Sequence, residues 1–189
     1  QLPGMDICVF GAGSLGSLVG GLLADAHDVT LVGRAPHTEV VDTEGLTITG
    51  AFEHSVQMTA RTGVPVEADL ALVTVKSFDT EEAARELASM DIGSALSLQN
   101  GMGNEQRLAS RLDCPVLAGT CTYGARLLGP GVVECTGRGS ITLGARDGGR
   151  SRAAKRVGDA FGATVLETTV SQRMPHRLWE KLAVNAGIN

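Results

Sequence analysis

Aromatic residues are scarce in this chain, where Phe, Tyr and Trp together make up 3% of 189 residues. Glycine, in contrast, occurs 25 times, and hydrophobic residues account for 43% of the chain. A composition rich in Gly, Val, Leu and Ala but poor in aromatic rings suits a tightly packed α/β sheet better than a β-sandwich. The length allows one full domain and the beginning of another.

Long apolar runs and basic stretches are also absent. No apolar run approaches the roughly 20 residues that a membrane span requires, and no signal segment precedes the first predicted strand. The formal net charge of −5 is spread along the chain, without a basic stripe that could neutralise phosphates. We therefore expect binding neither to a membrane nor to nucleic acid.

The cysteines are widely spaced and form no C-x-x-C motif; they are Cys8, Cys114, Cys121 and Cys135. Cys8 lies within an apolar strand pattern, where a thiol behaves as a small hydrophobic group. We expect neither a metal site nor a disulfide, and hence a reducing, cytoplasmic location.

Apolar strand patterns alternate with helical patterns along the chain. A predicted strand at 5–10, a glycine turn, a helix to about residue 26 and a strand at 27–32 form a βαβ unit with parallel strands. Further strands are predicted at 69–76, 95–98, 116–122 and 163–166, helices at 80–89, 104–112, 153–161 and 171–189, and hairpins around residues 50 (45–49 with 55–59) and 129–131. We therefore predict an α/β protein with a Rossmann-type, doubly wound and mainly parallel sheet.

The turn at residues 11–16 matches the G-x-G-x-x-G pattern. It follows an apolar strand and opens a helix, which is the context that a dinucleotide site requires. The first glycine allows a tight turn, the second lets the backbone approach a pyrophosphate, and the third lets the helix pack on the sheet. The helix N-terminus offers N–H groups to the phosphates. The predicted pyrophosphate site comprises Gly11, Ala12, Gly13, Ser14, Leu15 and Gly16.

The end of the second strand distinguishes NAD from NADP. An enzyme that selects NAD usually has Asp or Glu there, but this chain continues Val32-Gly33-Arg34 and has no acid before Glu39. A guanidinium can bind the 2′-phosphate of NADP through its fork of N–H donors. We therefore predict NADP as the cofactor, with Arg34 at its 2′-phosphate; the alternative is a solvated surface arginine.

Lys76 and Asn100 each follow a predicted buried strand. Ligands of open α/β sheets bind outside the carboxyl ends of the strands, so both residues are candidates for contact with the dinucleotide. The alternative is that they are solvated loop residues.

The last predicted helix carries polar residues on an apolar face. Lys181, Asn185 and Asn189 are spaced four residues apart, and Leu178 and Leu182 share their arc. Hydride transfer to a ketone develops an alkoxide, and a partly desolvated lysine with a lowered pKa can protonate it near neutral pH. The alternative is a lysine that reaches solvent past the helix edge, beside two structural asparagines.

Five segments carry a more specific signal: GAGSLG, LVTVKSFDT, LSLQNGMGNEQRL, LAGTCTYGAR and LWEKLAVNAGIN. In this order they resemble the ketopantoate reductases (2-dehydropantoate 2-reductases), and the resemblance covers nearly the whole chain from Met5 to Asn189. That family reduces 2-dehydropantoate to pantoate with NADPH, on the way to pantothenate and coenzyme A.

The resemblance implies a role for each matching residue. Lys181 matches the catalytic lysine that protonates the new alcohol, and Asn185 and Asn189 match substrate-binding asparagines. The resemblance also places Lys76 and Asn100 at the cofactor, and it implies a backbone contact from Ala125, which completes the predicted cofactor site.

Three parts of the chain are expected. Residues 1–4 precede a methionine that reads as a natural start, so we interpret them as a vector scar. Residues 5–168 form the NADP-binding Rossmann domain, and 169–189 begin a helical substrate and dimerisation domain that is truncated here. An exposed apolar stripe on this helix would promote association into a homo-oligomer.

Three hypotheses for the function remain open. The first is an NADPH-dependent 2-dehydropantoate reductase, poorly active as the isolated chain. The second is a stand-alone NADP-binding or sensing module, and the third is a related reductase of another small 2-keto acid. Retention of the Lys181 helix counts against a sensor, which would not need a proton donor.

Overall fold

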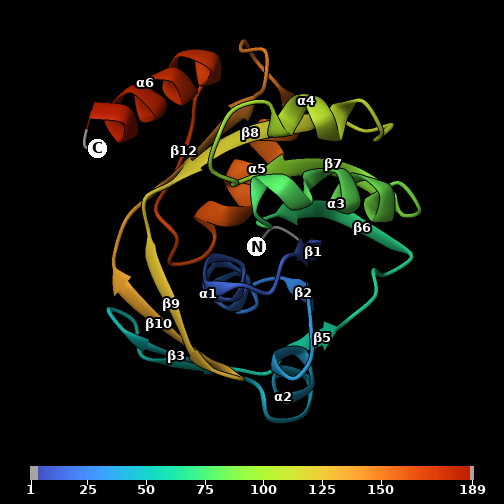
Figure 1. Cartoon of the computed structure of the whole chain (residues 1–189), viewed down its shortest axis with the longest axis vertical. Coiled ribbons are helices and arrows are strands. Elements are labelled where there is room, and N and C mark those ends of the chain that lie inside the picture. Colours follow the sequence, from blue (N-terminus) through green and yellow to red (C-terminus); the bar gives the residue numbers. More distant parts are fainter. Residues whose placement is uncertain (1–3, 188–189) are drawn as a thin grey trace.

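The computed structural model describes residues 4–187, and its centre is an eight-stranded sheet in the order β12-β11-β8-β7-β6-β1-β2-β5 (Figure 1). Every pairing in this sheet is parallel except β8 with β11. The predicted α/β fold with a mainly parallel Rossmann-type sheet is therefore confirmed. The strands are β1 (Asp6–Phe10), β2 (Asp28–Val32), β5 (Thr59–Arg61), β6 (Glu67–Val73), β7 (Asp91–Ser97), β8 (Val116–Cys121), β11 (Ile141–Ala145) and β12 (Thr168–Val170).

The carboxyl ends of the central strands are level with one another. Phe10 pairs with Val32 on one side and with Val73 on the other, and Val73 pairs with Ser97. These strands are rich in Val, Leu and Ala because helices cover both faces of the parallel sheet. The loops that follow the four strands therefore open onto one edge, which is where ligands of such sheets bind.

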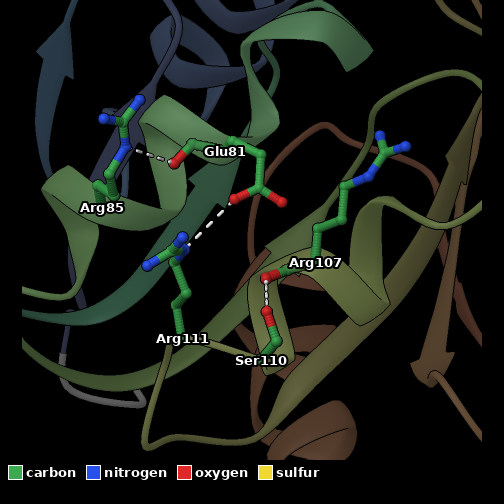
Figure 2. A network of polar contacts seen from close by, with 5 residues as sticks. All are labelled: Glu81, Arg85, Arg107, Ser110 and Arg111. Carbon is green, nitrogen blue, oxygen red and sulfur yellow. Dashed lines mark hydrogen bonds and ion pairs between the residues drawn. The ribbon is translucent and has the colours of Figure 1, made fainter.

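Helices cover the two faces of the main sheet. On one face α1 (Ser14–Leu23) and α5 (Arg152–Gly162) pack over the larger apolar core. On the other face α3 (Thr80–Leu87) and α4 (Asn104–Ala109) pack over a second core. Arg111, just after α4, donates a hydrogen bond of 3.3 Å to the carboxylate of Glu81 on α3, within the polar network that Figure 2 shows.

A second, four-stranded sheet packs against the outer side of α1, so that α1 lies between the two sheets (Figure 1). Its order is β4-β3-β10-β9, and both predicted hairpins, β3–β4 and β9–β10, belong to it. A short helix, α2, follows β2 and was not predicted. These elements are α2 (His37–Glu44), β3 (Leu46–Gly50), β4 (His54–Val56), β9 (Gly124–Gly129) and β10 (Val132–Gly137).

One predicted strand is wrong in part and another is wrong entirely. The predicted strand at 55–59 is divided, because β4 ends at Val56 while Thr59 begins β5 in the main sheet. The predicted strand at 163–166 is instead the turn that ends α5, where the Ala163 N–H bonds the Asp159 carbonyl. The strand beside β11 is β12, a few residues later.

The last helix, α6 (Met174–Gly187), packs against β8 and β11. Met174 is fully buried, but Trp179 is 61% exposed and Val184 59% exposed. β12, at the boundary predicted between the two domains, is still part of the main sheet, and the domain division stays a prediction. Within residues 4–187, no helix combines the length and apolar character needed to cross a membrane.

Candidate functional site

The glycine turn lies between β1 and α1, and each glycine meets different surroundings. Gly11 has a φ of +123°, in the left-handed region that side chains disfavour. A Cβ on Gly16 would lie 1.9 Å from the carbonyl oxygen of Gly11, whereas a Cβ on Gly13 would meet no atom within 4 Å. Gly13 is the N-cap of α1 and supplies no side-chain cap, so first-turn N–H groups remain for an anion. The turn thus fits a pyrophosphate.

Two hydroxyl groups hold this turn in place. Thr74, just after β6, donates a hydrogen bond of 2.8 Å from Oγ1 to the Gly11 carbonyl oxygen. Ser14 accepts a 3.0 Å hydrogen bond at Oγ from the Leu127 N–H and so joins the turn to β9. Thr74 was not predicted, because nothing in the sequence shows that it meets a residue 63 positions earlier. Its contact shows how the end of β6 supports the glycine turn.

Arg34 follows β2 at the same edge of the sheet. Gly33 approaches the glycine turn so closely that a Cβ there would lie 2.2 Å from the Ala12 Cβ. This approach brings the loop that carries Arg34 beside the turn. The Arg34 side chain is exposed, and within residues 4–187 it forms an ion pair with no carboxylate. A free guanidinium at this place fits the predicted contact with a 2′-phosphate.

Lys76 and Asn100 lie in neighbouring loops after β6 and β7, and both are exposed. The strand that was predicted to include Lys76 ends earlier, at Val73, so the lysine belongs to the loop. Ser77 joins the two loops, because its hydroxyl donates a hydrogen bond to the Asn100 carbonyl oxygen. The two predicted cofactor residues therefore lie on adjacent, connected loops at the carboxyl edge.

A buried chain of hydrogen bonds fixes the Asn100 loop. The Gln99 amide donates to the Thr80 hydroxyl over 2.8 Å, and this hydroxyl donates to Asn104 Oδ1 over 2.9 Å. The Asn104 amide in turn donates to the Asn100 carbonyl oxygen over 3.0 Å. Gln99, Thr80 and Asn104 are buried, and none of them was predicted as a site residue. The Q-N-G-M-G-N motif could have indicated Gln99 and Asn104, because polar residues next to a buried strand need hydrogen-bond partners.

Lys181 reaches this loop from α6. Its Nζ donates a hydrogen bond of 2.9 Å to Oδ1 of Asn100. The lysine is half-buried, and this desolvation lowers the pKa of its ammonium below the usual 10.5. Burial raises the pKa of the Cys121 thiol at the end of β8, and the Lys181 ammonium partly offsets this increase. A cation with a lowered pKa thus stands at the carboxyl edge of the sheet.

The remaining predicted residues lie at different distances from this site. Ala125 lies on β9, partly buried, two residues before the Leu127 N–H that bonds Ser14. Asn185 lies one helical turn after Lys181 and is exposed. Asn189 lies outside the described residues. The structure therefore brings the glycine turn, Arg34, Lys76, Asn100 and Lys181 to one edge of the sheet, with β9 beside the turn.

Comparison with known proteins gives one consistent family. Residues 7–148 match the family model described as "Ketopantoate reductase PanE/ApbA". A 2-dehydropantoate 2-reductase of Pyrococcus abyssi is 39% identical over 188 residues, which cover 98% of this chain and 62% of the relative. The chain therefore spans less than two thirds of the length of this relative.

Solved structures similar to this chain include a ketopantoate reductase and a D-mandelate dehydrogenase. A PanE/ApbA family ketopantoate reductase from Ralstonia eutropha superimposes with a TM-score of 0.86 at 31% identity, covering 95% of this chain and 60% of that one. A ternary structure of D-mandelate dehydrogenase with NADH and anilino(oxo)acetate gives a TM-score of 0.85 at 26% identity, with 95% and 61% coverage.

Proposed function

The chain belongs to the ketopantoate reductase family, and from this premise we propose that it forms the cofactor-binding part of an NADPH-dependent 2-dehydropantoate 2-reductase. The reaction reduces the ketone of a small 2-keto acid to the alcohol of pantoate. The contact between Lys181 Nζ and Asn100 Oδ1 is the observation that carries this proposal. It supports the proposal because the ammonium group lies at the edge of the sheet where dinucleotides bind to folds of this class.

The proposed cofactor is NADP, and the residues at the sheet edge fit it. The open backbone at Gly13 and the first turn of α1 would hold the pyrophosphate, together with the rest of the turn at residues 11–16. Arg34 would bind the 2′-phosphate, which an acidic residue at that place would repel. Lys76, Asn100 and Ala125 would contact the remainder of the cofactor.

The proposed chemistry assigns each polar group of this chain one task. NADPH, when bound, supplies the hydride that the ketone carbon accepts. Lys181 donates a proton to the ketone oxygen as negative charge develops there, and its lowered pKa makes this transfer easier near neutral pH. Asn100 accepts a hydrogen bond from the lysine and so holds Nζ in place. Asn185 and Asn189 are proposed to bind polar groups of the substrate.

A stand-alone NADP-binding or sensing module is the weaker hypothesis. Such a module needs the glycine turn and Arg34 but has no use for an ammonium group held beside Asn100. The contact joins residues 81 positions apart. Burial also partly desolvates the lysine, which costs free energy and would bring no benefit in a sensor.

A reductase of another 2-keto acid is the second candidate. The structural likeness to a D-mandelate dehydrogenase supports it, because that protein shares the fold over 95% of this chain. Its structure contains NADH, so the likeness also supports the alternative cofactor. Activity with 2-dehydropantoate and with phenylglyoxylate, compared at equal concentrations, distinguishes the two candidates.

The proposal is tested first by cofactor binding. Titration of the chain with NADPH and NADH, followed by nicotinamide fluorescence, should give clearly tighter binding of NADPH. Replacement of Arg34 by Gln should remove most of this preference, whereas equal affinities in the unchanged protein would remove NADP from the proposal. The gene product that carries this chain should then reduce 2-dehydropantoate with NADPH.

Three further expectations stay proposals. We propose that α6 begins the separate helical domain that was predicted for residues 169–189, that copies of the chain associate through α6, and that the protein works in the cytoplasm. The exposed Trp179 and Val184 on α6 support association. The four cysteines are all free thiols in the structure, which suits a reducing compartment.

A further inference from the structure

Arg61 lies at the same edge of the sheet as Arg34, on the neighbouring strand. It ends β5, which runs parallel to β2, and it pairs with Val32 in the register of the two strands. The Gly33 N–H donates a hydrogen bond of 3.1 Å to the Arg61 carbonyl oxygen. Adjacent strands are about 5 Å apart, so Arg61 lies beside the loop after β2, which contains Arg34.

The side chain of Arg61 is directed over one particular face of the sheet. Paired residues of parallel strands share a face, so Arg61 shares the face of Val32 and Phe10. Burial raises the pKa of the Cys8 thiol on this face to about 12, and the Arg61 guanidinium opposes that increase. Cys8 belongs to β1, which is two strands away from β5 in the sheet, so Arg61 lies at the border of the face that contains this thiol.

Arg61 lies at the border of this face and is itself open to solvent. The segment 62–66, which joins β5 to β6, forms no helix, and β5 is the edge strand of the sheet. Figure 1 shows β2, β5 and α2 together at the end of the molecule away from α6. Arg61 is exposed, and neither it nor Arg34 pairs with a carboxylate within the described residues. Two unpaired guanidinium groups thus flank the end of β2.

We propose that Arg61 is a second, specificity-determining residue for the 2′-phosphate of NADP, acting together with Arg34. This inference rests on the proposed function, because it assumes that the dinucleotide lies along this edge. A 2′-phosphate is a dianion with three acceptor oxygens. One guanidinium group cannot neutralise both charges and form hydrogen bonds to all three oxygens. The 2′-hydroxyl of NAD offers neither the charge nor the oxygens, so Arg61 discriminates between the two cofactors.

The test uses two ligands that differ only in the 2′-phosphate, adenosine 2′,5′-bisphosphate and adenosine 5′-monophosphate. Calorimetric titration of the chain measures the Kd of each. Arg61→Gln should raise the Kd of the bisphosphate by about tenfold or more and leave that of the monophosphate unchanged. Arg150→Gln is the matched control, since this exposed arginine follows β11, whose end lies beside the start of β8 at the opposite edge.

Each outcome bears on a different statement. If the unchanged chain prefers the bisphosphate and Arg61→Gln keeps that preference, the inference about Arg61 fails while the proposed cofactor stands. An equal loss of affinity for both ligands would also overturn it, because Arg61 would then act on the adenosine or the fold. If the unchanged chain binds both ligands equally, NADP itself is the wrong cofactor. Thermal unfolding of each variant shows whether it is folded.

Discussion

Lys181 Nζ lies 2.9 Å from Asn100 Oδ1, although the two residues are 81 positions apart in the chain. The lysine comes from the last helix, whereas the asparagine follows a central strand, so the contact depends on how α6 rests on the sheet. Asn100 is itself held by the buried chain that runs through Asn104 and Thr80. The Lys181 ammonium is therefore positioned by the core of the domain and not by α6 alone.

The pH dependence of turnover should reflect this contact. Lys181 can donate a proton only below its pKa, and desolvation lowers that pKa, so activity should decline with rising pH along a limb centred below 10.5. Asn100→Asp would place a carboxylate beside the ammonium and move this limb to higher pH. The measurement is kcat against pH for both proteins. An unmoved limb in Asn100→Asp would mean that another group is titrating.

Substitutions of Gly16 and Gly13 should distinguish a glycine that the fold requires from one that ligand binding requires. Gly16→Ala places a methyl group against the Gly11 carbonyl oxygen, and it should lower the free energy of unfolding by about 3 kcal/mol. Gly13→Ala has open space for its methyl group and should fold normally. It should nevertheless weaken NADPH binding by about tenfold, because the methyl group occupies the path of the pyrophosphate. Urea unfolding and NADPH titration of both variants check this prediction. Unaltered NADPH binding by Gly13→Ala would mean that the pyrophosphate does not bind at this turn.

Thr74 should stabilise the glycine turn through its hydroxyl. Thr74→Val keeps the shape of the side chain but loses the hydrogen bond to the Gly11 carbonyl oxygen. The expected cost is about 1 kcal/mol, which lowers Tm by about 3 °C in a domain of this size. Thr74→Ser keeps the hydroxyl and serves as the control. Equal Tm values for the Val and Ser variants would show that the hydroxyl contributes nothing.

His37 should make the domain less stable in mild acid. Its Nδ1 accepts a hydrogen bond from the Gly131 N–H, and its Nε2 bonds the Ser17 hydroxyl. Burial lowers the pKa of His37 below the usual 6.5, so the unfolded chain binds a proton more readily than the folded one. The free energy of unfolding should therefore be unaffected by His37 above pH 6.5 and fall as the pH decreases through the lowered pKa.

The control for this prediction is His37→Gln, which cannot take up a proton. Urea unfolding between pH 5 and 7.5 should show a weaker pH dependence in this variant than in the unchanged protein. The variant should also be less stable at pH 7.5, by about 1–3 kcal/mol, if it leaves the buried Gly131 N–H without a partner. Parallel pH curves for the two proteins would exclude His37 as the titrating group.

Much of the fold follows from local patterns. The glycine turn, the alternation of strands and helices, and the arc that contains Lys181 all lie within short segments, where spacing determines which face a residue occupies. α2 was missed because its sequence, HTEVVDTE, is short and rich in β-branched and acidic residues. The division at Val56 and Thr59 depends on which partner strand is available, and that is decided by tertiary pairing.

The site was less accessible to sequence reasoning than the fold. The positions of Arg34, Lys76 and Asn100 at the carboxyl edge could be predicted because these residues follow apolar strands at equivalent ends. The positions of Thr74 and Arg61 beside them could not, since they arise from strands that become neighbours only in the folded sheet. The contact between Lys181 and Asn100 could not be predicted either, because the sequence indicated each residue separately but not the hydrogen bond between them.

The central claim is that Lys181 donates the proton and does not merely help to bind NADPH. Turnover and the Kd of NADPH should therefore be measured together for Lys181→Ala in the gene product that carries this chain. We predict that kcat falls by about 10²–10⁴-fold while the Kd of NADPH stays near that of the unchanged protein. Unchanged turnover, or a loss explained wholly by weaker NADPH binding, would contradict the account.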